Sequence, residues 1–93
     1  MAVTFDVRVL TPERAVFDGK AVHLLAPGTE GYLGVLAHHA PLMTALASGR
    51  LEVRDADGVE RVYHVRGGFL EVSRNSARVL ADRIEEGEVV ARG

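Results

Sequence analysis

The feature that most constrains this chain is a hydrophobic period of two residues. In residues 4–10 apolar side chains alternate with polar ones: Phe5, Val7 and Val9 against Thr4, Asp6 and Arg8. This alternation is typical of a β-strand with one face on a core and the other in water. No segment carries a helical period for the length that a packed helix needs, and turn signals recur at short intervals. The chain is therefore predicted to be all-β, as a sandwich or flattened barrel.

Turn residues predict where the strands end. Residues 11–14 (TPER) indicate a turn, because Pro12 cannot donate a hydrogen bond into a sheet. Asp18 and Gly19 form a dipeptide that favours a tight turn, so residues 15–27 are predicted to form two short strands around it. One face of the second strand would carry Val22, Leu24 and Ala26.

The clearest hairpin lies within residues 49–68, with Asp57 and Gly58 in its loop. A further strand pair is predicted around residues 74–76, with Leu70 and Val72 facing Val79 or Leu80 according to the register. The remaining residues, 83–93, form a short charged tail.

Composition narrows the class of protein. A chain of 93 residues forms one domain, predicted to span residues 1–93, and its 47% hydrophobic and 26% charged content is that of a globular protein. A net charge of −2 without a basic cluster argues against a nucleic-acid partner. Asp6 and Arg8 interrupt the only apolar stretch at the N-terminus, so we expect neither a signal peptide nor a membrane-spanning segment.

Histidines are the candidates for chemistry. A metal site would draw on His23, His38, His39 and His64. The adjacent pair at 38 and 39 would point to opposite faces of an extended strand, so both could bind one metal only if a turn re-aimed them. The ligand spacing of a β-barrel metalloenzyme is absent, and we expect no bound metal or cofactor. A small cupin-like metal-dependent enzyme remains the alternative to a non-catalytic domain.

Other catalytic patterns are weaker. The serines lie in turn-like surroundings without the sequence that surrounds a hydrolase nucleophile. The glycines at 28, 31 and 34 precede no helix that could receive a phosphate, so we expect no nucleotide or small-molecule substrate.

Three ordered motifs carry a family resemblance: "EGYLGVLAHHAPLMTAL" at residues 30–46, "RGGFLEV" at 66–72 and "VLAD" at 79–82. Together they closely resemble the N-terminal domain of the epsilon subunit of F-type ATP synthases, from about residue 5 to residue 82. The resemblance implies a flattened ten-stranded β-sandwich at the foot of the central stalk. It also implies a non-catalytic rotor subunit that binds the gamma subunit, rests on the membrane c-ring and helps to couple ion flow to ATP synthesis. Its location would be peripheral, on the cytoplasmic face of a bacterial inner membrane or the equivalent face of an organelle membrane.

The same resemblance implies two interfaces. The c-ring loop would comprise Gly31, Tyr32, Leu33 and Gly34, with Tyr32 either packed on the c-ring or folded back over its own sandwich. The gamma-facing surface would comprise His39, Thr44, Arg66 and Glu71, unless the His39 ring merely caps the turn at Pro41. For His38 we expect a turn with positive φ, a side chain toward solvent and no chemical role.

Most relatives continue into a C-terminal helical hairpin that restrains ATP hydrolysis and in some species binds ATP. The 93-residue sequence stops at Gly93. We therefore expect the helical domain, and with it ATP binding, to be absent.

Overall fold

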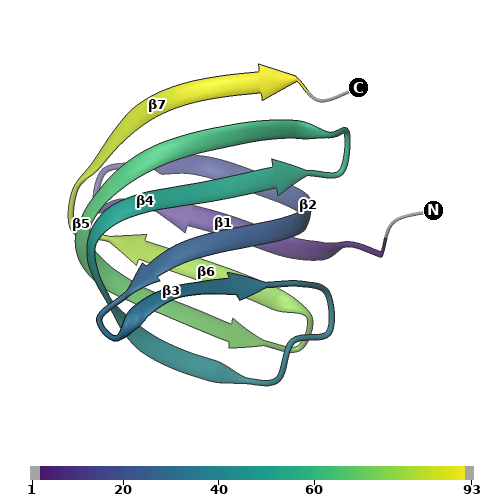
Figure 1. The fold of residues 1–93 in the computed structure, drawn as a ribbon, viewed down its shortest axis with the longest axis horizontal. Helices are drawn as coiled ribbons and strands as arrows, with labels where there is room; N and C mark the ends of the chain where they lie inside the picture. The colour runs from purple at the N-terminus through teal and green to yellow at the C-terminus, as the bar shows by residue number, and fades with distance from the viewer. Residues whose placement is uncertain (1–2, 92–93) are drawn as a thin grey trace.

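Seven strands make up the structure, a computed structural model that describes residues 3–91. In chain order they are β1 (Phe5–Leu10), β2 (Ala15–Gly28), β3 (Gly31–Val35), β4 (Leu42–Asp55), β5 (Val59–Ser73), β6 (Ser76–Ala81) and β7 (Ile84–Ala91) (Figure 1). The all-β prediction is confirmed. Within residues 3–91 there is no helix long and apolar enough to span a membrane.

The strands close into a ring. The sheet runs β1-β6-β5-β4-β2-β3, and an additional pairing of β1 with β2 joins its ends, leaving β3 on β2 and β7 on β5 as flanking strands. The pairings are antiparallel except that β1 runs parallel to β6. Closure gives each central strand two hydrogen-bonded neighbours and surrounds a single core.

The expected number of ten strands is wrong: the described residues form seven. The difference lies in the three longest strands, β2, β4 and β5, of 14, 14 and 15 residues. Figure 1 shows β4 and β5 bending from the layer that carries β7 to the layer that carries β6. β5 pairs with β7 through residues 59–65 and with β6 through residues 68–73, so one continuous strand serves both layers.

The predicted turn at Asp18 and Gly19 is also wrong. Both residues lie inside β2, where Asp18 pairs with Arg8 and Gly19 with Val7 of β1. All six residues of β1 pair with β2, and this pairing outweighs the local preference of Asp18 and Gly19 for a turn. The register then shifts between Ala21 and His23.

The shift changes which side chains of β2 face the core. Leu24 and Ala26 are fully buried, as expected, but Val22 is only half-buried. Ala21 takes the inward position before the shift and is fully buried.

The β4–β5 hairpin confirms the prediction of a loop at Asp57 and Gly58. Gly58 has a φ of 85°, and the Asp55 side chain closes the loop by accepting hydrogen bonds from the N–H groups of Asp57 and Val59, at 2.9 and 3.0 Å. The hairpin is longer than expected, because β5 continues through Gly67 and Gly68 rather than ending there.

The β5–β6 pair is confirmed as well, with a tight turn at Arg74 and Asn75, whose φ values are 53° and 57°. Two consecutive positive φ values are those of a type I′ turn. The register places Leu70 opposite Val79, which decides between the two alternatives. The charged tail forms β7 on the edge of β5, a strand that the pattern did not predict.

The core lies between the two layers and is built from small and medium apolar side chains. The largest fully buried ones are Phe5, Leu24, Leu51 and Leu70, with valines around them. Such a close-packed interior deforms little under load.

Candidate functional site

The segment of residues 31–44 forms β3, a loop and the start of β4. β3 turns back on β2 directly after residues 29 and 30, with Gly28 opposite Gly31. Gly31 has a φ of 128°, a conformation open to glycine almost alone, and a Cβ there would meet nothing within 4 Å. The expectation that residues 31–34 form a loop is wrong: the turn is at residues 29 and 30, and residues 31–34 belong to the short strand β3. Leu33 is half-buried against the core, while Gly31, Tyr32 and Gly34 are exposed.

Tyr32 is folded back and exposed at the same time. Its hydroxyl accepts a hydrogen bond from the backbone N–H of Arg50 at 3.0 Å, yet the residue keeps 58% of its surface exposed. Gly49 leaves the room for this arrangement, since a Cβ there would lie 2.8 Å from the Tyr32 hydroxyl oxygen. The Tyr32 ring is thus fixed against β4 while still offering an apolar surface to solvent.

His38 and His39 are separated by the turn that links β3 to β4. The N–H of His39 donates to the carbonyl of Leu36 at 3.2 Å, and His38 between them has a φ of 63° and an exposed side chain. The conformation predicted for His38 is confirmed. The His39 ring is half-buried, and its Nδ1 lies 2.7 Å from the carbonyl oxygen of Ala40, so it caps the approach to Pro41.

The four residues predicted to face gamma do not gather into one cluster. Thr44 lies opposite Leu70 and is half-buried on the inner side, with its hydroxyl donating to the carbonyl of Ala45 at 3.3 Å. Glu71 lies on the outer side, paired with Arg78 at 2.9 Å. Arg66 is five residues earlier on β5, about 16 Å of extended chain away, and pairs with Glu85 of β7 at 3.3 Å. Of the three, Glu71 has the surroundings of an interface residue.

An exposed apolar patch surrounds that position. Met43 of β4, Phe69 of β5 and Leu80 of β6 are 67%, 55% and 42% exposed, and with Glu71 and Arg78 they line a shallow hollow of about 230 Å³. We call Met43, Phe69 and Leu80 the Phe69 patch. Exposed apolar side chains with a polar rim are a common feature of protein–protein interfaces, so this patch is the candidate interface on this face.

The sequence held a signal for the Phe69 patch. On a strand, two adjacent apolar residues place one side chain on each face, and Phe69 precedes Leu70 as Leu80 follows Val79. Leu70 and Val79 are fully buried and paired, so Phe69 and Leu80, paired with each other, must face outward. Only the register shows that the two lie side by side.

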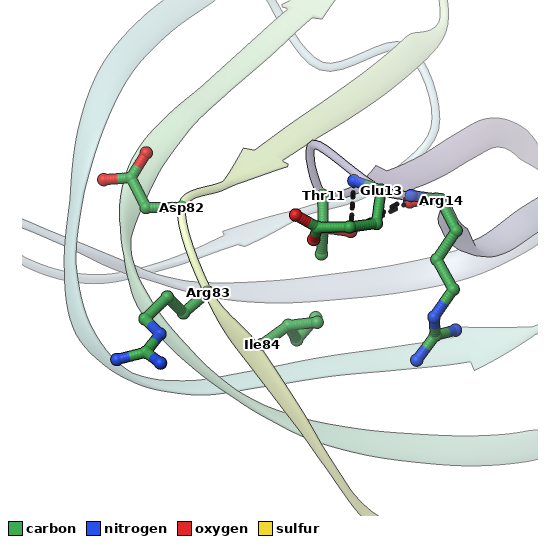
Figure 2. A pocket seen from close by; sticks show the side chains of 6 residues that line it. All are labelled: Thr11, Glu13, Arg14, Asp82, Arg83 and Ile84. Atoms are coloured by element: carbon green, nitrogen blue, oxygen red, sulfur yellow. Dashed lines mark hydrogen bonds between the residues drawn. The ribbon is translucent and has the colours of Figure 1, made fainter.

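A polar hollow opens between the β1–β2 turn and the connection from β6 to β7. Its lining consists of Thr11, Glu13, Arg14, Asp82, Arg83 and Ile84, and Figure 2 shows the charged groups pointing in different directions. The Thr11 hydroxyl is engaged in the turn, accepting from the N–H groups of Glu13 and Arg14 at 3.3 and 3.2 Å. No set of catalytic groups converges among these six side chains.

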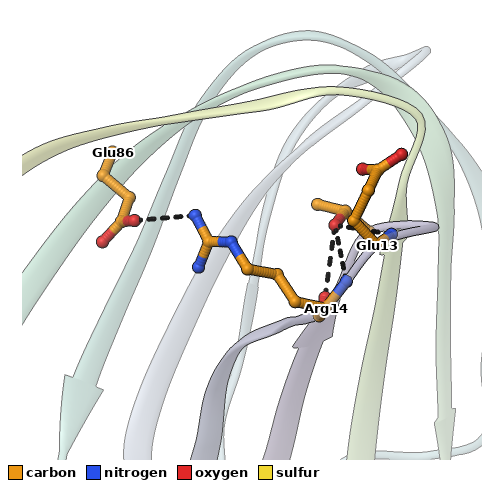
Figure 3. A network of polar contacts seen from close by, with 4 residues as sticks. Glu13, Arg14 and Glu86 are labelled. Atoms are coloured by element: carbon orange, nitrogen blue, oxygen red, sulfur yellow. Dashed lines mark hydrogen bonds and ion pairs between the residues drawn. The ribbon is translucent and has the colours of Figure 1, made fainter.

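Arg14 also connects this turn to the last strand. Its guanidinium donates to the carboxylate of Glu86 at 3.0 Å, as Figure 3 shows, with both side chains 58% exposed. Exposed ion pairs of this kind contribute less than about 1 kcal/mol. The contact helps to align β7 without anchoring it.

Among the described residues, Tyr63 has a pKa that is clearly shifted from its ordinary value. Burial raises the pKa of its phenol above the ordinary value of 10.0, while the charge of Arg61 opposes the rise and that of Glu86 adds to it. The ring belongs to the core and is 4% exposed. A neutral, buried phenol of this kind is a packing residue rather than an acid or base.

Residues 3–91 bring no three histidine, aspartate or glutamate side chains into a group that could hold a metal ion. His23 lies on β2 and His64 on β5, where its side chain is exposed, while His38 and His39 belong to the β3–β4 turn. The cupin-like alternative therefore finds no ligand set in this part of the chain.

Comparisons with known proteins agree on one family. Residues 4–87 match the family model described as "ATP synthase, Delta/Epsilon chain, beta-sandwich domain". The ATP synthase epsilon chain of Synechococcus sp. (strain JA-2-3B'a(2-13)) is 46% identical over 88 residues, which are 95% of this chain and 64% of that protein. The chain thus spans less than two thirds of the length of this relative.

Two solved structures share the fold. A chain of the mitochondrial ATP synthase of Euglena gracilis aligns with a TM-score of 0.84 at 22% identity, covering 92% of this chain and 55% of that one. A chain of the Tetrahymena thermophila mitochondrial ATP synthase, in a structure of its central stalk and c-ring, aligns with a TM-score of 0.73 at 19% identity, covering 90% and 67%. With the family match over residues 4–87, the chain belongs to the ATP synthase delta/epsilon chain family and represents its β-sandwich domain.

Proposed function

We propose that this domain works in the central stalk of an ATP synthase, as a non-catalytic link between the gamma subunit and the membrane c-ring that helps to couple ion translocation to ATP synthesis. Membership of the delta/epsilon chain family supports this role, as does a similar chain in a solved structure of a central stalk and c-ring. The domain would then be peripheral to an energy-transducing membrane and held there through its partners.

The Phe69 patch is the observation that carries the gamma contact. Met43, Phe69 and Leu80 present apolar surface from three neighbouring strands, and the ion pair of Glu71 with Arg78 lies at their edge. Apolar anchors inside a polar rim are how lasting interfaces are built, at about 800 Å² per partner. We place gamma on this face, with His39 and Glu71 at its margin and with Thr44 and Arg66 less directly involved.

The c-ring contact would use the exposed residues at the start of β3, Gly31, Tyr32 and Gly34, directly after the β2–β3 turn. Gly31 and Gly34 carry no side chains that could obstruct a partner loop, and the Tyr32 ring offers apolar surface in a fixed position. Aromatic rings held in this way are common interface anchors because little side-chain entropy is lost on binding.

The closed ring of strands suits a mechanical role. A unit charge crossing a membrane releases about 2.3 kcal/mol per 100 mV, and a rotor must carry such steps without slipping at its joints. β4 and β5 extend through both layers, so load applied to one layer is transmitted along covalent chain to the other.

Co-purification tests the proposal. When the 93-residue chain carries an affinity tag and is expressed with its cognate gamma subunit and c-ring, we expect gamma to be recovered at one copy per chain and the c-ring to join only when gamma is present or membranes are included. Metal analysis of the same sample addresses the enzyme alternative. Stoichiometric zinc or iron without bound gamma would overturn the central-stalk proposal.

Tyr32 allows a sharper test of the c-ring contact. Replacing Tyr32 by alanine removes the exposed ring, so reconstituted synthase should make less ATP for each ion translocated. Tyr32→Phe keeps the ring and loses only the bond from Arg50, and should preserve at least most of the coupling. An unchanged ratio of ATP made to ions translocated in Tyr32→Ala would contradict the assignment.

A further inference from the structure

Asn75 joins three parts of the chain through its short side chain and backbone. Its Oδ1 accepts a hydrogen bond from the backbone N–H of His38 at 2.8 Å, and its Nδ2 donates to the carbonyl of Thr4 at 3.0 Å. Its own carbonyl accepts from the N–H of Asp6 at 3.2 Å. The β5–β6 turn, the start of β1 and the β3–β4 loop are thus tied together at one residue.

The two ends of the amide match their partners without ambiguity. The oxygen faces an N–H donor and the nitrogen faces a carbonyl acceptor, so a flipped amide would lose both bonds. Asn75 also suits the backbone, since its φ of 57° lies in the left-handed region that asparagine tolerates better than most residues. Side chain and backbone requirements therefore select the same residue type.

The contact reaches the loop at its most constrained point. His38 has a φ of 63°, which costs a residue with a Cβ free energy unless its surroundings hold it. The bond from the His38 N–H to Asn75 supplies such a restraint from a turn that is 37 residues away in sequence. The loop continues directly into β4, where Met43 of the Phe69 patch is the second residue.

We propose that Asn75 is a positioning residue for the gamma-facing surface. Its hydrogen bond with the His38 N–H, which we call the clasp, fixes His39 and the start of β4 in the arrangement that gamma recognises. This inference rests on the proposed central-stalk function. It assigns to the β5–β6 turn a part in partner binding although Asn75 itself need not touch the partner.

Three substitutions separate the clasp from the turn that carries it. Asn75→Gly keeps the left-handed backbone and removes both side-chain bonds. Asn75→Asp keeps an acceptor for the His38 N–H and removes the donor to Thr4. Arg74→Gly changes the neighbouring turn residue, whose side chain makes no hydrogen bond or ion pair within residues 3–91.

Two measurements are made on each variant of the 93-residue chain: amide hydrogen exchange at His38 by NMR, and the dissociation constant for the cognate gamma subunit. Loss of a hydrogen bond of ordinary strength should accelerate His38 exchange about fivefold in Asn75→Gly and weaken gamma binding by a similar factor. In Arg74→Gly both quantities should stay within about twofold of the original chain, since the bond to His38 is retained. In Asn75→Asp both losses should be smaller than in Asn75→Gly, because the acceptor for the His38 N–H remains although a carboxylate oxygen now faces the Thr4 carbonyl. Rescue by aspartate is the result that a purely structural role in the turn would not give.

Contrary outcomes are distinguishable. Unchanged His38 exchange in Asn75→Gly would overturn the clasp, and faster exchange with unchanged gamma affinity would overturn the positioning role. If both losses in Asn75→Asp were as large as in Asn75→Gly, keeping an acceptor for the His38 N–H would have no effect, against the proposal. If the unaltered chain failed to bind gamma, the central-stalk function and the presentation to gamma would both be wrong, while the exchange data would still decide whether the clasp exists.

Discussion

Replacing Gly68 by alanine is expected to lower the free energy of unfolding by at least about 4 kcal/mol. Gly68 has a φ of 129°, a conformation that residues with a Cβ rarely adopt, and a Cβ at this position would lie 2.0 Å from the carbonyl oxygen of Leu80. The obstructing atom is backbone in the paired strand β6, so it cannot move aside without breaking the sheet. The loss would be a large fraction of the roughly 5 to 15 kcal/mol that a domain typically has.

Two other glycines provide matched controls for Gly68→Ala. Gly31 has nearly the same φ, 128°, but a Cβ there meets nothing within 4 Å, so Gly31→Ala should cost only the backbone strain of about 1–3 kcal/mol. Gly19 lies in β2 without a positive φ, and a Cβ there would make ordinary contact with the Phe17 ring at 3.5 Å. Gly19→Ala should change stability by less than about 1 kcal/mol. Urea denaturation of the three variants measures their free energies of unfolding and checks the expected ranking. If Gly68→Ala were as stable as Gly31→Ala, the backbone of β6 would have to shift to accommodate the added Cβ, against the prediction.

Replacing Phe69 by aspartate is expected to weaken binding to the gamma subunit at least about thirtyfold. Phe69 lies between Met43 and Leu80 in the exposed apolar patch, and its neighbour Glu71 is already negative. Aspartate would remove the aromatic ring of the patch and place a second carboxylate at a position where its desolvation on binding costs free energy. Because Phe69 is 55% exposed, the fold itself should lose little stability.

The matched control is Val89→Asp on β7. Val89 is 63% exposed and apolar like Phe69, but β7 pairs with the early part of β5, away from the Phe69 patch. Binding measured by titration calorimetry should be unchanged in this variant, provided that both variants keep the unfolding midpoint of the original chain. Equal loss of affinity in the two variants would indicate a non-specific effect of charge, and no loss in Phe69→Asp would place gamma on another face.

The strands that could be predicted from the sequence are those whose local signals agree with their pairing. At Asn75 and at Gly58 the turn residues adopt the positive φ values that their types favour, and the flanking alternation continues into paired strands. Asp18 and Gly19 carry an equally strong turn signal, yet they pair with β1 because that strand lies beside them in the closed ring. The sequence does not predict β7, because a charged segment is typical of a solvated tail. The segment forms a strand through its hydrogen-bonded pairing with β5.

The features of the candidate site likewise fall into those that local sequence predicts and those that depend on distant residues. The backbone of His38 was predictable, since few residue types are enriched at positive φ and the resemblance to a known family placed a turn there. The environment of Arg66 was not, because the bend at Gly67 and Gly68 turns it toward Glu85 and away from Glu71. The folded-back but exposed arrangement of Tyr32 depends on Gly49, which lies on another strand and which no local pattern connects to Tyr32.

By itself the sequence determined the all-β class, the two confirmed hairpin loops and the family, because alternation, turn residues and ordered motifs are local properties of the chain. Only the tertiary structure decided the number of strands, the partners of β2 and β7, and the gathering of Met43, Phe69 and Leu80 into one exposed surface. The tertiary structure also showed the hydrogen bond from the His38 N–H to the Asn75 side chain. The physical reason is that hydrogen-bond register and ring closure join residues far apart along the chain, and both depend on the packing of all the strands at once.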